Sequence, residues 1–181
     1  MSAARRPART GAIVAAIVLG LFFELLATQI GGGGGTRSSQ LVGGPVPEFD
    51  LPILDGGSLA SSDLAGTTYL VNFWNEWCIP CRQEHPALVA FQAAHRDDPA
   101  VRLIGIVRDE RSLAAVREYV AAEGVTWTVL LDPGGDAKVA FGTTGQPETF
   151  AIDAEGIVRD YQYGPATSER LEEMLATAGG R

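Results

Sequence analysis

The chain has 181 residues, of which 46% are hydrophobic and 20% charged, and its formal net charge is −8 at pH 7. After Ile30 the imbalance is larger, because eleven basic residues stand against twenty-one acidic ones. This charge disfavours nucleic acid and anionic lipid surfaces as partners, so we expect no nucleic-acid contact.

A basic and then apolar segment opens the chain. Arg5, Arg6 and Arg9 precede an almost unbroken apolar run over residues 12–30. A helix over this run would be roughly 28 Å long, close to the hydrocarbon thickness of a bilayer. The arginines favour a cytoplasmic N-terminus, so we expect residues 1–11 inside, a single-pass transmembrane signal anchor at 12–30, and the rest of the chain outside the cytoplasm.

A cleaved signal peptide is the alternative interpretation of this run, because the length suits both. The run exceeds the usual apolar core of a signal peptide, and no convincing small-x-small cleavage site lies near residues 27–29. Glu24 lies inside the run, where a carboxylate is costly unless it pairs, contacts another helix or reaches the interface. We favour the uncleaved anchor.

A segment rich in glycine and serine follows at residues 31–46. It has no apolar periodicity and therefore predicts a flexible tether, whose r.m.s. span would be roughly 20 Å. The remainder, residues 47–181, has the length of one domain with its own core.

Extended and helical patterns alternate along this domain. Short runs of β-branched and aromatic residues predict strands, and apolar residues at helical spacing predict helices. The expected strands are residues 49–54, 69–74, 101–107, 128–131, 149–152 and 157–163, and the expected helices are residues 80–96, 112–123, 137–141 and 168–178. This order predicts an α/β domain with a parallel portion in its sheet, and the turn at 153–156 predicts a hairpin between the last two strands.

The only two cysteines, Cys78 and Cys81, stand between the strand 69–74 and the helix that follows it. Cys78 is therefore expected at a helix N-terminus, where free N–H groups and the helix dipole stabilise a thiolate. The thiolate is the nucleophile of disulfide exchange, so a redox dithiol is the leading interpretation. Ile79 and Pro80, between the cysteines, are expected to tune the redox potential because they change how well those N–H groups stabilise the thiolate.

Two other uses of the cysteine pair are open. A closed zinc site needs four ligands, and beyond the thiols the chain offers only His85, which we expect to be structural, and His95. A structural disulfide closing so short a loop would restrict the unfolded chain little. We therefore expect no metal, and no cofactor other than the redox-active disulfide itself.

Two segments that are far apart in the chain carry a more specific signal. Residues 70–86 read LVNFWNEWCIPCRQEHP, and residues 145–153 read GQPETFAID. The first resembles the active-site segment, and the second the cis-proline segment, of the thioredoxin superfamily. Within it, the best match is the membrane-anchored TlpA, ResA and CcmG/DsbE group of bacterial cytochrome c maturation. The resemblance covers about residues 47–178 and implies a thioredoxin-like fold, with a central mixed sheet flanked by helices, after the N-terminal transmembrane helix.

This resemblance assigns roles to individual residues. Cys78 would be the exposed nucleophile, and Cys81 the resolving thiol that closes the redox-active Cys78–Cys81 disulfide. Trp77 would shield the dithiol and offer an apolar contact to substrates. Pro147 would be cis, so that its loop leaves the backbone of Gln146 free to bind an extended substrate strand.

Two acidic residues also receive expected roles. Glu148 would line the substrate groove, because its Pro-Glu-Thr-Phe context matches the same group. Asn72 stands where cytoplasmic-type thioredoxins carry a buried aspartate, and an amide cannot take a proton. In the resembling group an acid three residues after the second cysteine is implicated in this proton transfer, and Glu84 stands there, about one helical turn along from Cys81. The resemblance therefore implies that Glu84 carries the proton, with a pKa raised by burial. A solvated position on the helix surface is the alternative for Glu84.

Together these features predict a thiol-disulfide oxidoreductase anchored in a bacterial cell membrane, with its catalytic domain outside the cytoplasm. We interpret it as a reductant in cytochrome c maturation, acting through a mixed disulfide. The expected partners are protein thiols and disulfides such as apocytochrome c, and a transmembrane thiol protein that donates electrons; the chain itself is expected to be a monomer.

Three other functions use the same fold. The spacing of the cysteines does not give the direction of transfer, so a general disulfide oxidoreductase of other substrates stays open. A copper or haem chaperone on the same fold is the alternative from a different class. A peroxiredoxin is disfavoured, because the chain lacks an isolated peroxidatic cysteine in the appropriate motif.

Overall fold

The computed structural model describes most of the chain, namely residues 18–21, 38–108 and 112–179. The predicted segment 1–11 and most of the predicted anchor at 12–30 lie outside these residues, apart from one helical turn at Val18–Leu21. None of the helices described is both long enough and apolar enough to span a bilayer. The chain divides into two units, Met1–Thr36 and Arg37–Arg181, and the second contains the predicted domain.

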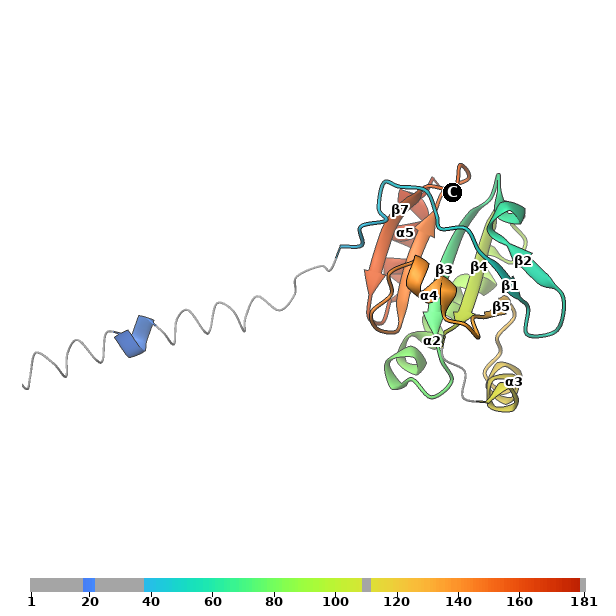
Figure 1. Ribbon diagram of the computed structural model, residues 1–181, viewed down its shortest axis with the longest axis horizontal. Helices are drawn as coiled ribbons and strands as arrows, with labels where there is room; N and C mark the ends of the chain where they lie inside the picture. Colours follow the sequence, from blue (N-terminus) through green and yellow to red (C-terminus); the bar gives the residue numbers. More distant parts are fainter. Residues whose placement is uncertain (1–17, 22–37, 109–111, 180–181) are drawn as a thin grey trace, which may run out of the picture. The chain divides into compact units, whose positions relative to one another are not determined.

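Strands and helices alternate through this domain (Figure 1). The strands are β1 (Asp50–Pro52), β2 (Ser58–Ala60), β3 (Thr68–Trp74), β4 (Val101–Val107), β5 (Thr128–Leu131), β6 (Glu148–Ile152) and β7 (Val158–Tyr163). The helices are the 3-10 helix η1 (Ser61–Leu64) and the α-helices α2 (Ile79–His95), α3 (Leu113–Ala122), α4 (Asp136–Ala140) and α5 (Ser168–Thr177). Every predicted helix is present, and each of its ends lies within one residue of the prediction.

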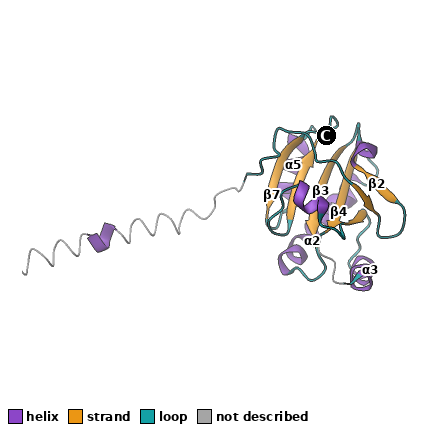
Figure 2. Ribbon diagram, in the orientation of Figure 1, coloured by secondary structure: helices purple, strands orange, loops and turns teal. Residues whose placement is uncertain are grey.

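The central sheet has five strands in the order β5-β4-β3-β6-β7. β3 runs parallel to β4, and β4 parallel to β5, whereas β6 is antiparallel to both of its neighbours, β3 and β7. The strands form the middle of the domain and the helices lie outside them (Figure 2). This is the mixed sheet flanked by helices that was predicted.

β3 is the middle strand, and all seven of its residues are buried. Its side chains alternate between two apolar cores, as the two-residue period of a strand requires. Leu70 and Trp74 belong to one core, and Val71 and Phe73 to the other. Burial on both faces explains why this segment reads as a continuous apolar run in the sequence.

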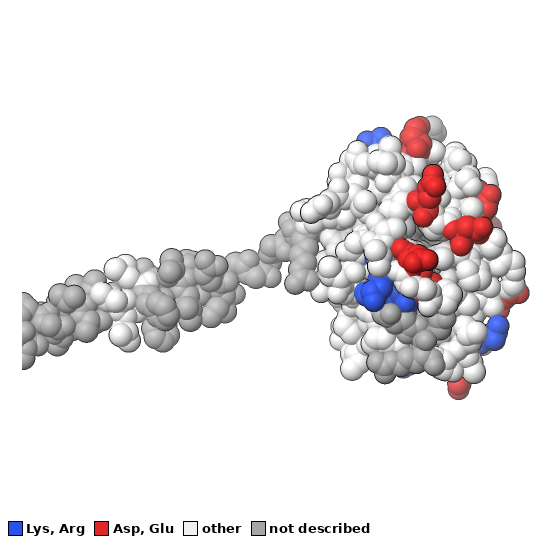
Figure 3. Space-filling view, in the orientation of Figure 1, with Lys and Arg blue, Asp and Glu red and all other residues white. Residues whose placement is uncertain are grey.

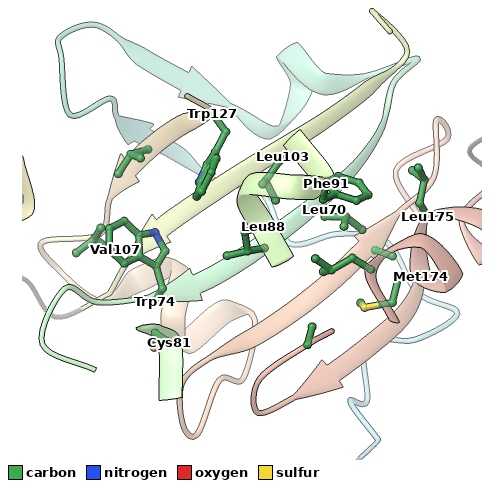
Figure 4. Packing of buried hydrophobic residues seen from close by; sticks show 14 of the residues in the cluster. Leu70, Trp74, Cys81, Leu88, Phe91, Leu103, Val107, Trp127, Met174 and Leu175 are labelled. Carbon is green, nitrogen blue, oxygen red and sulfur yellow. The ribbon is translucent and has the colours of Figure 1, made fainter. Parts of the chain in front are cut away.

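Different elements cover the two faces of the sheet. On the first face, Leu88 and Phe91 of α2 pack in one core with Met174 and Leu175 of α5 (Figure 4). On the second face, the ring of Phe141, which follows α4, lies 5.1 Å from the rings of both Phe73 and Phe150. Phe49 and Leu64, from the N-terminal part of the domain, belong to the same core, and the ring of Phe49 lies 6.3 Å from that of Phe141.

The domain begins earlier than predicted. The Gly43 N–H donates to the Val158 carbonyl oxygen at 2.8 Å, and the Val158 N–H donates to the Gly44 carbonyl oxygen at 2.9 Å. Leu41 also packs against the second core. The later part of the predicted tether at 31–46 is therefore part of the domain. The prediction was wrong there because a glycine-rich composition gives no sign of the backbone hydrogen bonds that the segment makes with β7.

A short antiparallel hairpin of β1 and β2 precedes the central sheet. Its connection contains Gly56 and Gly57, both with positive φ. β2 itself was not predicted, because the three residues Ser58–Ala60 include no β-branched or aromatic side chain.

Candidate active site

The dithiol lies where the central strand leads into α2. β3 ends at Trp74 and α2 begins at Ile79, so the connection is short. Cys78 is the N-cap residue of α2, and its Sγ accepts a hydrogen bond from the Cys81 N–H at 3.2 Å. The sulfur thus occupies the place of a capping oxygen, at the positive end of the helix dipole. Negative charge on this sulfur is stabilised by both effects.

Cys78 and Cys81 form a disulfide, with a Cα–Cα distance of 5.2 Å, so the structure describes the oxidised state. Both residues are 4% exposed, which is less than was expected for Cys78. Of the two, however, only Cys78 lines a hollow of about 460 Å³, together with Trp77, Ile79, Pro80, Arg108, Gly145 and Gln146. A group that enters this hollow therefore meets Cys78 and not Cys81.

An apolar rim surrounds the hollow. Ile79 is 72% exposed and Trp77 38% exposed, whereas Trp74 is buried in the first core. Pro80 lies in the first turn of α2, where its missing N–H breaks no helical hydrogen bond. Trp77, Ile79 and Pro80 therefore lie together beside the disulfide, where an apolar contact to a substrate was predicted.

The loop before β6 faces Cys78. The peptide bond between Gln146 and Pro147 is cis, as the resemblance implied. The Gln146 carbonyl oxygen lies 3.9 Å from Cys78 Sγ, and Gln146 precedes the first strand residue, Glu148. The side-chain amide of Gln146 is buried and has no hydrogen-bond partner in the described part of the chain. This loop therefore brings polar groups to the edge of the hollow.

Glu148 lies behind this loop and not in the hollow. It is 1% exposed, and its Oε1 accepts hydrogen bonds from the N–H groups of Thr144 at 2.7 Å and Gly145 at 2.6 Å. Its Oε2 accepts a hydrogen bond from the Tyr161 hydroxyl at 2.8 Å. A carboxylate buried in this way has no exposed surface with which to line the substrate groove. The prediction that Glu148 lines this groove is therefore wrong, and Glu148 instead holds the loop before β6 in place.

Glu84 is buried between α2 and the sheet, with 1% of its surface exposed. Its Oε1 accepts a hydrogen bond from Asn72 Nδ2 at 2.8 Å, and its Oε2 accepts one from the Ala166 N–H at 3.0 Å. Burial raises the pKa of Glu84 to about 7, although the hydrogen bonds from Ala166 and Asn72 act in the opposite direction. The carboxyl group is thus neither solvated nor permanently charged near neutral pH.

Asn72 can form a hydrogen bond with Glu84 in either protonation state of the carboxyl group. Its Nδ2 donates to the carboxylate and also to Thr149 Oγ1 at 2.9 Å, whereas its Oδ1 is buried and accepts no hydrogen bond from the residues described. Rotation of the amide by a half turn would present Oδ1 to a protonated Glu84. An aspartate at this position would repel the Glu84 carboxylate, and an asparagine does not.

Arg108 belongs to the site but was not predicted. It directly follows β4, is 7% exposed, lines the hollow, and donates a hydrogen bond from Nη1 to the Gly145 carbonyl oxygen. Its position follows from the parallel pairing of β3 with β4, which places Val107 beside Trp74, a register that the sequence pattern alone does not give. The residue after one strand must then lie near the residues that follow the other.

The environment of His85 fits a structural role. Its Nε2 donates to the Glu123 carbonyl oxygen at 2.9 Å, and its ring lies 5.3 Å from that of Tyr119 and 5.6 Å from that of Trp127. Over residues 38–108 and 112–179, no three His, Cys, Asp or Glu side chains group in the manner of a metal site.

Glu84 should make folding depend on pH. Its pKa rises from 4.5 to about 7 on folding, so between these pH values the folded protein binds more protons than the unfolded chain. The contribution to the free energy of unfolding is fully present below 4.5 and is lost as the pH rises through 7. We expect a loss of up to about 3 kcal/mol across this window.

Urea unfolding of the wild-type protein and of Glu84→Gln at a series of pH values measures this loss. The variant should lack most of the decline, because an amide does not titrate. Glu118→Gln, at an exposed position on α3, is the matched control and should keep the wild-type pH dependence. A decline of equal size in the wild type and in Glu84→Gln would contradict the assignment.

The sequence matches known proteins over most of its length. Residues 41–177 match the Redoxin family. The thiol:disulfide interchange protein DsbE of Allochromatium vinosum is 39% identical over 175 residues, which cover 92% of each chain. The thiol-disulfide oxidoreductase ResA of Bacillus cereus is 31% identical over 134 residues, which cover 74% of this chain and 76% of ResA.

Solved structures agree with these matches. A thiol:disulfide interchange protein of Chlorobium tepidum, 29% identical, superposes with a TM-score of 0.68 over 80% of this chain and 100% of its own. StoA of Bacillus subtilis, 26% identical, superposes with a TM-score of 0.62 over 71% of this chain and 96% of its own. These matches confirm the thioredoxin-like fold. The chain belongs to the Redoxin family and, within it, to the thiol-disulfide oxidoreductases of the TlpA, ResA and CcmG/DsbE group.

Proposed function

We propose that this protein reduces disulfide bonds in other proteins outside the cytoplasm, and that its substrates include apocytochrome c during cytochrome c maturation. The observation that carries the proposal is the position of Cys78, at the N-cap of α2, alone of the two cysteines in the hollow, and facing the cis-proline loop. The names of the DsbE relatives are consistent with disulfide chemistry of this kind.

The first step is attack on the substrate. In the reduced protein, the Cys78 thiolate attacks one sulfur of the substrate disulfide. A bond forms between Cys78 Sγ and that sulfur, the substrate S–S bond breaks, and the departing substrate thiolate takes a proton from solvent. The helix N-terminus favours the Cys78 thiolate, and the apolar rim of Trp77 and Ile79 covers the mixed disulfide.

The second step resolves the mixed disulfide. Cys81 gives its proton to the Glu84 carboxylate and attacks Cys78 Sγ, which closes the Cys78–Cys81 disulfide and releases the second substrate thiolate. Side chains three residues apart on a helix have Cβ atoms about 5–6 Å apart, so one water molecule suffices to carry the proton. A pKa of about 7 lets Glu84 both accept this proton and release it at neutral pH.

The substrate leaves with two more electrons, and the protein is then oxidised, as in this structure. A transmembrane thiol protein would return the two electrons through the same exchange in reverse, with Cys78 again as the sulfur that is attacked. The proposed direction requires that this donor keep the dithiol reduced.

The charge of the domain favours a basic polypeptide as substrate. Acidic side chains predominate over basic ones on the face shown in Figure 3, in line with the excess of acidic residues after Ile30. Charge complementarity raises the rate of encounter more than the final affinity. The apolar rim and the Gln146 backbone would then engage the segment around the substrate cysteine.

A trapping experiment tests the assigned nucleophile. In Cys81→Ser, the reduced protein should attack a disulfide substrate such as insulin and remain bound to it, because no second thiol resolves the mixed disulfide. Non-reducing electrophoresis and mass spectrometry would then show an adduct through Cys78. The matched variant Cys78→Ser should give no adduct. Adducts through Cys81, or none from either variant, would refute the proposed exchange.

The proposed location rests on residues 12–30 and on the part of the tether beyond the described residues. A chain that lacks residues 1–37 should appear in the soluble fraction, while the full chain should stay with membranes after carbonate extraction. Recovery of the full chain in the soluble fraction would contradict the proposed anchor.

A further inference from the structure

Gly145, two residues before the cis-proline, is contacted from three directions. Its carbonyl oxygen accepts a hydrogen bond from Arg108 Nη1, and its N–H donates to Glu148 Oε1 at 2.6 Å. A Cβ atom added at Gly145 would lie 2.6 Å from the Tyr163 hydroxyl oxygen and 3.0 Å from the ring edge, so the Tyr163 side chain lies directly against this residue. Gly145 is therefore held by hydrogen bonds to both of its peptide groups, and the Tyr163 side chain packs against its Cα.

The two hydrogen-bonding side chains are buried and oppositely charged. Arg108 is 7% exposed and Glu148 1% exposed. Arg108 follows β4 and Glu148 begins β6, the two strands on either side of β3, so the sheet fixes both backbones. Hydrogen bonds that involve a charged group are stronger than neutral ones, and in a buried site they are costly to break.

Gly145 in turn places the loop opposite the disulfide. The next residue, Gln146, has its carbonyl oxygen 3.9 Å from Cys78 Sγ. Arg108, Gly145 and Cys78 line the same hollow. A small displacement of Gly145 therefore changes the space between the loop and the sulfur, which is where an extended substrate segment has to fit.

We propose that Arg108 is a positioning residue of this active site: with Glu148 it clamps Gly145 and so sets the gap between the cis-proline loop and Cys78 for an extended polypeptide. The inference rests on the proposed exchange function and adds a residue that lies in neither of the two recognised sequence segments. Arg108 acts here through Gly145 and not on the reacting sulfurs.

Two kinds of substrate separate this role from an effect on the thiol. A polypeptide disulfide needs the loop, because its backbone would lie alongside Gln146. A small disulfide such as 2-hydroxyethyl disulfide has no polypeptide backbone to align along the loop, so its rate reports chiefly the reactivity of the thiolate. Loss of the clamp should therefore slow the first reaction and spare the second.

The experiment compares both rates in the reduced full-length chain and in Arg108→Gln. We expect the rate with insulin to fall about tenfold or more, and the rate with 2-hydroxyethyl disulfide to change less than about twofold. Arg117→Gln is the matched control, because Arg117 also donates to a backbone carbonyl, that of Leu54 at 3.2 Å, but does not line the hollow. Thermal unfolding of each variant measures how much of it is folded.

Each outcome either supports or overturns the positioning role of Arg108. An equal loss with both substrates would mean that Arg108 acts on the thiol, and an unchanged rate with insulin would mean that the clamp is not needed; either overturns the inference. If Arg108→Gln does not fold, Arg108→Lys takes its place, since it keeps the charge but loses the planar fork of donors. A selective loss with insulin then supports the clamp, and an equal or absent loss overturns it. Failure of the wild-type protein with both substrates would instead contradict the exchange function.

Discussion

The pairing of β3 with one parallel and one antiparallel neighbour decides where the chemistry lies. Trp74 pairs with Val107 of parallel β4, and Phe73 pairs with Glu148 of antiparallel β6. The end of β3, the end of β4 and the start of β6 therefore meet at one edge of the sheet. The disulfide, the arginine and the cis-proline loop come from separate parts of the sequence, and this register alone brings them together. Because β3 is buried on both faces, a slip by one residue would move every side chain into the opposite core and disrupt the packing of both.

The same burial creates the environment of Glu84. Packing between α2 and the sheet buries the carboxyl group of Glu84, which raises its pKa to about 7. Hydrogen bonds from Asn72 and from the Ala166 N–H make the burial tolerable without removing the shift. The burial of Glu84 therefore lowers the stability of the fold at neutral pH, and it also gives a group near Cys81 that can take up and release a proton. Lower stability of this kind is common at active sites.

Local patterns predict the part of the site that lies on one continuous segment. A strand followed at once by an amphipathic helix fixes Cys78 at the helix start, and the helical period places Glu84 on the face of Cys81 that packs inward. The roles of Arg108 and Glu148 depend instead on which strands are neighbours and in what register, and a single sequence does not contain that information. For the same reason the segment 31–46 reads as a tether, although its later residues pair with β7. The elements of the central sheet and their order were therefore predictable, as was the site along α2 and, through the resemblance, the cis-proline loop.

The account depends most directly on the direction of electron transfer. Equilibration of the Cys78–Cys81 pair with glutathione buffers, followed by alkylation and mass spectrometry, gives its reduction potential in the full-length chain. If the protein is a reductant, the reduction potential of the pair should be close to the roughly −270 mV of thioredoxin. A value near the roughly −120 mV of strongly oxidising dithiol proteins would contradict the account, because such a pair would give disulfides to its substrates rather than remove them.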